Sequence, residues 1–283
     1  MSRIARTAHG EHAAKKRFGQ NFLHDANVIE RIIRSLNPKP QDHLIEIGPG
    51  LGALTAPLLQ RLGHLRVIEL DRDVIPHLRA TCGDNANLEI IMADALKVDY
   101  AALAPAGEKL RLIGNLPYNI STPILFHLLQ FSGYIADMHF MLQKEVVDRM
   151  CADPGDDDYG RLTVTLAARA EVAKLFTVGP GAFTPAPKVD SAIVRLVPRP
   201  PPFAIDDLKQ YDRVVTAAFS QRRKTLANGL KTLLSAAQIS ATGIDPGIRA
   251  ERLSPAEFAR LANALPLPSP LAGEGLRGHG CPR

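Results

Sequence analysis

Four short apolar runs recur along the first half of the chain, and each ends in a glycine turn, an acidic residue or an amide. The runs lie near residues 43–47, 65–71, 88–92 and 110–113 and are rich in Val, Ile and Leu, as is typical of parallel strands buried on both faces. Segments with helical periodicity, such as Ala53–Leu62, separate them. This alternation predicts a doubly wound α/β domain with its ligand at the carboxyl ends of the strands.

The residue types at the first three strand ends suit a bound nucleoside. Gly48–Gly52 has the spacing Gly-x-Gly-x-Gly and runs into a helix, so backbone and a positive helix end can approach a ligand. Glu69 stands 21 residues after Gly48, the separation at which an acid can accept hydrogen bonds from ribose hydroxyls. Asp94 follows the third strand and could contact the exocyclic amine of an adenine, or only cap a helix.

The fourth strand leads into Asn115-Leu116-Pro117-Tyr118. An amino group conjugated to an aromatic base is a poor nucleophile, because its lone pair is delocalised into the ring. The Asn115 side-chain oxygen and the Leu116 backbone carbonyl can accept its two N–H bonds, while Tyr118 can stack on the base. Thr122 is expected to cap the next helix, with Pro123 at its first position. For the tetrapeptide alone, a strand-end turn without chemistry remains an equal alternative.

Charge and cysteine usage narrow the class of protein. The 283 residues carry a net charge of +5, with five Lys/Arg against one Asp/Glu in residues 1–24 and ten against six in residues 199–260. Basic ends around a mildly acidic middle indicate a polyanionic partner, although solvated lysines and arginines are the ordinary alternative. The three cysteines are far apart, and no motif suggests a metal or a membrane span. We therefore expect a cytoplasmic protein without metal, acting as a monomer.

Together these motifs resemble the ribosomal RNA adenine-N6 dimethyltransferases, specifically the bacterial small-subunit type that modifies two neighbouring adenosines near the 3′ end of 16S rRNA. The resemblance runs from about residue 15 to 262. The stretches that carry it are Phe18–Leu23, Glu46–Gly52, Glu69, Asp94, Asn115–Tyr118, Phe183–Ser191 and Phe219–Leu226.

The resemblance implies S-adenosylmethionine as methyl donor and assigns a role to each matching residue. Near the cofactor, Asn21 and Leu23 would close over it, Gly48 would lie against it, Glu69 would hold the ribose and Asp94 the adenine. Asn115 would lie between cofactor and target base. Phe183 would form a second aromatic wall beside Tyr118, or else be a core residue. Leu116 replaces the first proline of a related Asn-Pro-Pro-Tyr pattern, and a backbone contact survives that change. The cations expected to grip RNA are Arg222, Arg223 and Lys224.

The expected organisation has four parts: a basic arm (1–24) closing on the cofactor site, a catalytic domain (25–199), a small helical RNA-binding domain (200–264) and a disordered tail (265–283). Three other readings stay open. They are a large-subunit dimethylase of the macrolide-resistance type, a non-catalytic ribosome-assembly or transcription factor on the same scaffold, and a nicotinamide oxidoreductase. The Gly-x-Gly-x-Gly spacing argues against the last.

Overall fold

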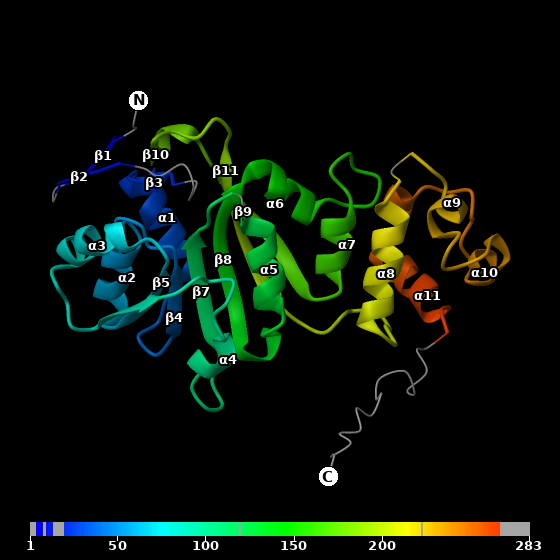
Figure 1. Cartoon of the computed structure of the whole chain (residues 1–283), viewed down its shortest axis with the longest axis horizontal. Coiled ribbons are helices and arrows are strands. Elements are labelled where there is room, and N and C mark those ends of the chain that lie inside the picture. The colour runs from blue at the N-terminus through cyan, green and yellow to red at the C-terminus, as the bar shows by residue number, and fades with distance from the viewer. Residues whose placement is uncertain (1–3, 8–9, 14–19, 119, 222, 267–283) are drawn as a thin grey trace, which may run out of the picture. The chain divides into compact units, whose positions relative to one another are not determined.

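The computed structural model describes residues 4–7, 10–13, 20–118, 120–221 and 223–266 (Figure 1). The chain divides into two compact units, Met1–Pro201 and Pro202–Arg283, and the division falls within the Pro-rich stretch that ends the expected catalytic domain. The basic cluster Lys15–Arg17 and most of the expected tail lie outside the described residues. Among the described helices, none has the length and apolarity needed to cross a membrane.

A seven-stranded sheet forms the centre of the first unit, in the order β6-β5-β4-β7-β8-β11-β9. The strands are β4 (His43–Ile47), β5 (Leu65–Glu69), β6 (Leu88–Met92), β7 (Leu110–Asn115), β8 (Ile135–Gln143), β9 (Ala170–Val178) and β11 (Ser191–Pro198). The first five in spatial order are parallel, and β11 is antiparallel to both of its neighbours. The predicted doubly wound α/β domain is confirmed. The strand order reverses between β4 and β7, where such sheets bind their ligands.

Helices cover both faces of this sheet. They are α1 (Ala26–Leu36), α2 (Thr55–Leu62), α3 (Ile75–Cys82), α4 (Tyr100–Leu103), α5 (Ser121–Leu129), α6 (Lys144–Cys151) and α7 (Arg161–Ala167). One apolar core joins the sheet to α4–α7 through residues such as Leu125 and Phe140, and Figure 1 shows α5 and α6 in front of the strands. A second core joins the opposite face to α1–α3 through Ile33 and Leu58. Each fully buried side chain of this size contributes about 1.5–3 kcal/mol.

The start of α5 differs from the expectation. The helix begins at Ser121 after the N-cap residue Ile120, which makes no side-chain cap, so Thr122 and Pro123 lie inside the first turn. Ser121 supplies the polar contact at this end, because its Oγ donates to the Tyr118 carbonyl at 3.0 Å. The capping prediction was therefore wrong by two residues. By contrast, Asp25 caps α1 by accepting from the backbone N–H groups of Asn27 and Val28.

Two short antiparallel pairs lie outside the main sheet. β1 (Ile4–Thr7) pairs with β2 (Gly10–Ala13). β3 (Phe22–Leu23) pairs with β10 (Phe183–Thr184), and the His24 N–H adds a bond of 2.9 Å to the Ala182 carbonyl. The second pair joins the end of the N-terminal arm to a segment 160 residues later in the sequence.

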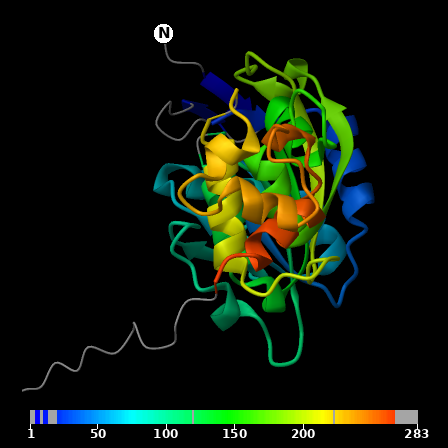
Figure 2. The same cartoon turned by 90° about the vertical axis from the view of Figure 1, so that its right-hand side faces the viewer.

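The second unit is helical, as predicted. Its helices are α8 (Leu208–Phe219), α9 (Leu226–Leu230), α10 (Ala236–Ala241) and α11 (Pro255–Asn263). Figure 2 shows α11 crossing close to α8, and Phe219 and Phe258 bring their ring centroids to 5.5 Å. Ser254 and Glu257 form a capping box at the start of α11.

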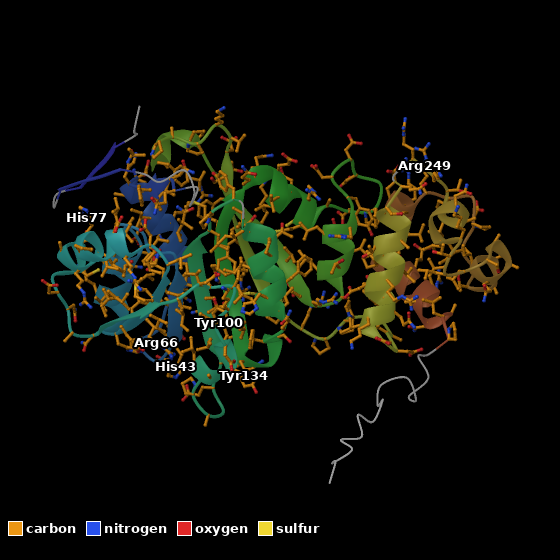
Figure 3. The ribbon with its side chains drawn as sticks, viewed as in Figure 1. His43, Arg66, His77, Tyr100, Tyr134 and Arg249 are labelled. Carbon is orange, nitrogen blue, oxygen red and sulfur yellow. The ribbon has the colours of Figure 1, made fainter. Side chains whose placement is uncertain are left out.

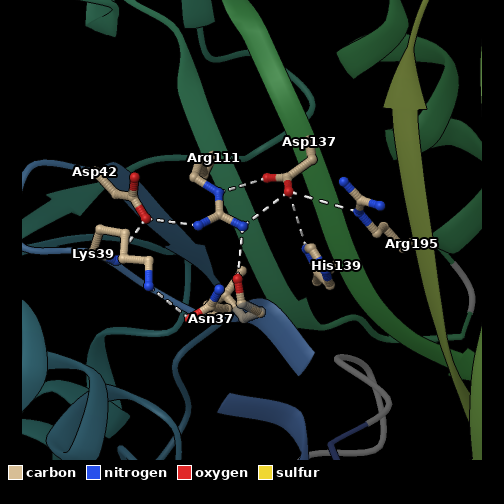
Figure 4. Close-up of polar contacts among 8 residues, drawn as sticks. Asn37, Lys39, Asp42, Arg111, Asp137, His139 and Arg195 are labelled. Atoms are coloured by element: carbon tan, nitrogen blue, oxygen red, sulfur yellow. Dashed lines mark hydrogen bonds and ion pairs between the residues drawn. The ribbon is translucent and has the colours of Figure 1, made fainter. Parts of the chain in front are cut away.

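The amino ends of the parallel strands carry charged contacts of their own. Figure 3 labels His43 and Arg66 at this edge, where His43 Nε2 lies 2.7 Å from Glu108 Oε2. Deeper in the sheet, Arg111 binds Asp137 at 2.8 Å, Asp42 at 2.6 Å and the last carbonyl of α1 (Figure 4). Arg111 therefore ties two strands, a loop and a helix end together at the edge opposite the ligand crevice.

Candidate active site

A cavity of about 1100 Å³, its open mouth included, lies at the carboxyl ends of β4, β5, β6 and β7. The lining combines apolar side chains with a few polar groups that come from the glycine turn, the strand ends, the Asn115 turn and the N-terminal arm. The predicted residues that line it are Asn21, Leu23, Gly48, Glu69, Asp94, Asn115, Leu116 and Tyr118.

The glycine turn after β4 has a backbone that only glycine adopts without strain. Gly48, Gly50 and Gly52 have φ of +69°, +53° and +90°. A Cβ on Gly50 would also lie 3.2 Å from the Phe22 ring of the arm. Gly114 lies near the end of the neighbouring strand β7. A Cβ on Gly114 would lie 2.4 Å from the Ile47 carbonyl, so this residue must be glycine for β4 and β7 to end side by side. The turn thus presents bare backbone to the pocket.

The Glu69 carboxylate is fixed by backbone donors. Its Oε1 accepts from the Leu70 N–H at 2.8 Å and the Asp71 N–H at 2.7 Å. Burial raises the pKa of Glu69, whereas these bonds and one from the Gly50 backbone act to lower it. A carboxylate offers about four lone-pair sites, so it can still accept from a ligand hydroxyl in the pocket.

Glu46 lines the same pocket but is more deeply buried than Glu69. It is 2% exposed and accepts a hydrogen bond of 2.7 Å from the Thr55 hydroxyl. Burial raises its pKa to about 8; the Thr55 bond opposes this shift and the nearby Glu69 charge adds to it. At neutral pH, Glu46 is therefore mostly protonated.

Asp94 acts as a cap at the edge of the cavity, and its expected contact with an adenine amine stays a prediction. Its Oδ1 accepts from the Leu96 N–H at 3.0 Å, as a cap does. It also lines the cavity. Nearby, burial and the Asp94 charge raise the pKa of the Tyr100 hydroxyl, which donates to the Ala95 carbonyl at 3.2 Å. The Tyr100 hydroxyl thus holds the segment that follows β6, and the Asp94 carboxylate of this segment lies at the pocket.

The Asn115–Tyr118 turn is anchored along its length. The Leu116 N–H donates to the Met141 carbonyl at 3.2 Å, and the Leu116 side chain is 1% exposed in the apolar core. The Tyr118 hydroxyl shares a hydrogen bond of 2.9 Å with Ser191 Oγ. Burial raises the pKa of Tyr118, which the Ser191 bond partly offsets. This packing explains an apolar residue at 116, and Leu116 also lines the pocket.

The N-terminal arm is bonded to both halves of the pocket. Asn115 Nδ2 donates to the Asn21 backbone carbonyl at 2.9 Å. Gln20 Nε2 donates at 2.9 Å to Oδ2 of Asp71, whose backbone N–H holds the Glu69 carboxylate. Because its Nδ2 is used in this way, the Asn115 amide has its oxygen available for another group.

Three of the predicted site residues lie elsewhere. Phe183 is 3% exposed in the second core and, in β10, pairs with Leu23; it is not among the residues that line the cavity. Arg223 and Lys224 are exposed in the second unit, and Arg222 lies outside the described residues. Within the described parts of the chain, no group of three His, Cys, Asp or Glu side chains could hold a metal ion.

Gln20, Asp71 and Ser191 were missed by sequence reasoning. Gln20 and Ser191 both stand within motifs that the resemblance identified, but their contacts join segments 51 and 73 residues apart. Asp71 closely follows Glu69, and its position alone reads as a turn residue. No local pattern indicates such contacts.

Comparison with known proteins identifies the family to which the chain belongs. Residues 11–266 match the family described as Ribosomal RNA adenine dimethylase. Proteins named Ribosomal RNA small subunit methyltransferase A from Pseudomonas fluorescens and Pseudomonas aeruginosa are each 56% identical over 256 residues, covering 90% of this chain and 95% and 96% of theirs.

Two solved structures are also similar. The 23S rRNA methyltransferase ErmE has a TM-score of 0.69 at 28% identity, covering 87% of this chain and 99% of its own. A dimethyladenosine transferase from Plasmodium falciparum has a TM-score of 0.69 at 27% identity, with coverages of 85% and 95%. With a family match over most of its length and curated relatives above half identity, this chain belongs to the ribosomal RNA adenine dimethylase family.

Proposed function

We propose that this protein transfers methyl groups from S-adenosylmethionine to N6 of two adjacent adenosines near the 3′ end of 16S rRNA, giving N6,N6-dimethyladenosines during small-subunit biogenesis. The observation that carries the proposal is the meeting in one cavity of the glycine turn, Glu69 and Asp94 with the Asn115–Tyr118 turn. The small-subunit relatives at 56% identity, against 28% for the 23S enzyme, support the small subunit as substrate.

The cavity fits S-adenosylmethionine. A Cβ on Gly48 would point toward the Asn115 carbonyl, 3.9 Å away, so the glycine keeps open the space between the nucleoside side and the Asn115 turn. Glu69 would accept from the ribose and Asp94 from the adenine amine, and the arm residues Asn21 and Leu23, which line the same cavity, would cover them. When bound, the cofactor supplies an electrophilic methyl group on a positively charged sulfur.

Asn115 and Leu116 would act on the target amine. With its Nδ2 bonded to the arm, Asn115 offers Oδ1 to one N–H of the amine, and the Leu116 carbonyl accepts the other. These bonds favour tetrahedral nitrogen and free its lone pair. No general base is required, because a protonated methylamino product is acidic enough to lose its proton to water. After the first transfer a single N–H remains, so the second transfer proceeds with one of the two acceptors.

Tyr118 would stack on a target adenine that has left its own stack. Its ring lines the cavity and its hydroxyl is tied to Ser191. A second wall formed by Phe183 would require its ring, 3% exposed here, to turn out of the core, and this role stays a prediction. In the second unit, Arg223 and Lys224 are exposed and suit contacts to RNA phosphates.

The test is transfer of labelled methyl groups from S-adenosylmethionine to unmethylated small ribosomal subunits, with products mapped by nuclease digestion and mass spectrometry. We expect dimethyladenosine at two adjacent positions. Asn115→Ala should lose at least about 10²-fold in transfer rate while binding of the cofactor persists. Asn87→Ala, which removes an exposed amide in the turn before β6, serves as the matched control and should transfer at the wild-type rate.

Two outcomes would overturn the proposal. Methyl uptake by large subunits alone would assign the protein to the large-subunit dimethylases. Tight binding to small subunits with no incorporation would instead indicate an assembly factor. If Asn115→Ala kept its rate within a few fold, the function could stand but the role given to Asn115 would be wrong.

A further inference from the structure

Tyr118 is held by hydrogen bonds at its backbone carbonyl and at its side-chain hydroxyl. At the backbone end, the Tyr118 carbonyl accepts from Ser121 Oγ at 3.0 Å, which joins the turn to the first residue of α5. At the far end, its hydroxyl lies 2.9 Å from Ser191 Oγ. A tyrosine attached only through its backbone can swing about two side-chain bonds, whereas a second attachment at the hydroxyl fixes the long axis of the ring.

Ser191 is a rigid support for that second attachment. It is the first residue of β11, is 1% exposed, and pairs with Gln143 of β8 on one side and Val178 of β9 on the other. The preceding carbonyl, of Asp190, accepts from the Lys144 N–H at 2.9 Å. The Ser191 hydroxyl therefore stands on a strand that is bonded on both sides, while Tyr118 stands on a turn.

Ser191 also lies beyond the wall of the cavity. Tyr118 is among the residues that line the cavity and Ser191 is not, so Ser191 is placed to act on a bound base through the Tyr118 ring. The hydrogen bond joins residues 73 positions apart and reaches from the central sheet to the ring. This is the arrangement in which a supporting residue fixes the rotamer of a working one.

We propose that Ser191 is a positioning residue for methyl transfer: its hydroxyl holds the Tyr118 ring in the orientation on which the target base stacks. The inference rests on the proposed function, because it takes Tyr118 to be the stacking platform. A ring that tilts moves the stacked amine relative to the methyl group, and a misplacement of about 1 Å can cost about 10²-fold in rate. A bond that merely satisfied a buried hydroxyl would affect folding stability and leave the rate unchanged.

The experiment compares Ser191→Ala, Tyr118→Phe and the double variant. Each removes one or both partners of the same hydrogen bond and leaves the Tyr118 ring in place. Thr163→Val is the control for loss of a buried hydroxyl, since the Thr163 hydroxyl donates to the Arg149 carbonyl and accepts from the Gly160 N–H in a buried site away from the cavity. For each protein, single-turnover transfer to small subunits, the Kd for S-adenosylmethionine and the Tm are measured.

We expect Ser191→Ala and Tyr118→Phe each to slow single-turnover transfer by about 10- to 100-fold. The double variant should be no slower than the worse single variant, because both changes break one bond. The Kd for the cofactor should stay within about twofold, and the Tm of Ser191→Ala should fall no further than that of Thr163→Val.

Transfer by Ser191→Ala within about twofold of wild type would overturn the positioning role, as would losses that multiply in the double variant. These results are distinct from failure of the proposed function. If the function is wrong, the wild-type protein itself transfers no methyl groups to small subunits. If only the positioning role is wrong, wild type is active and Asn115→Ala is inactive, while Ser191→Ala is as fast as wild type.

Discussion

Glu46 is a buried pocket residue whose raised pKa makes its charge sensitive to what is bound beside it. Its carboxyl group is buried, with a pKa raised to about 8 by that burial, and it shares the cavity with Glu69. A cation placed in the cavity would favour the carboxylate and lower this pKa. Since the proposed cofactor carries a positive sulfur, its binding should release the proton from Glu46.

This coupling predicts that affinity for S-adenosylmethionine rises with pH. Below about pH 8 the free protein holds a proton that the complex does not, so affinity should increase by up to about tenfold per pH unit and level off above the pKa. Calorimetry between pH 6.5 and 9, in buffers of different ionisation enthalpy, measures both the affinity and the released proton.

Glu46→Gln is the matched control for this prediction. It keeps the acceptor for the Thr55 hydroxyl but cannot ionise, so it should show only the pH dependence of the cofactor's own amino group. Equal pH profiles and equal proton release for the two proteins would contradict the coupling.

The sequence predicted which residues lie at the site, but it did not predict their protonation or their burial. The strand-end placing of Glu69, Asp94 and Asn115 follows from periodicity and turn residues, and all three line the cavity. The raised pKa of Glu46 depends on how many atoms cover it, which no local pattern records. For the same reason, burial of Phe183 could not be distinguished in advance from exposure beside a target base.

Among the elements, β7, β8, α1 and the loop before β4 are joined by a single side chain. Arg111 binds Asp137 at 2.8 Å and Asp42 at 2.6 Å, in a setting where its own side chain is 16% exposed (Figure 4). Burial acts to lower the pKa of Arg111, but the two carboxylates outweigh it and raise the pKa. Removing the arginine leaves two carboxylates without their shared cation.

Arg111→Ala should therefore lower the free energy of unfolding by about 3–5 kcal/mol. Urea unfolding at pH 7 measures the loss. Arg61→Ala is the matched control, because Arg61 binds Glu30 at 2.7 Å but both side chains are more than a third exposed; it should lose less than about 1 kcal/mol. Losses of similar size in the two variants would show that burial does not determine how much the Arg111 contacts contribute to the free energy of unfolding.

Element prediction succeeded where the local signal was strong. The four apolar runs near residues 43–47, 65–71, 88–92 and 110–113 all became parallel strands. The antiparallel strands β9 and β11 were not predicted, since β9 alternates buried and exposed residues irregularly. The start of α5 was misplaced because Thr and Pro are good helix-start residues wherever they fall near one.

At the scale of the whole molecule, sheet order decides which distant residues meet. β11 lies beside β8, and this brings Ser191 to Tyr118 across 73 residues, while the β3–β10 pair brings the arm to the cavity. Strand order follows from packing of complete helices against the sheet, so a motif search finds the segments but not these contacts. The family resemblance predicted roles for the site residues, but it did not predict the contacts that position them.

Charge is the other property of the whole molecule that carries a prediction. The second unit exposes Lys224 just after α8, where the proposed RNA contact lies, and Lys209 at the start of the same helix. The two ends of a 12-residue helix are about 17 Å apart, so one lysine can contact phosphate while the other does not. Lys224→Ser should weaken RNA binding and reduce the slope of log affinity against log salt by about 0.7–0.9. Lys209→Ser removes the same charge and should leave the slope unchanged. Fluorescence anisotropy with a labelled 16S rRNA 3′ fragment, from 50 to 200 mM salt, measures both slopes.

Equal changes of slope in the two variants would mean that the second unit attracts RNA through its overall charge. The assignment of the cations after α8 as specific phosphate contacts would then be wrong.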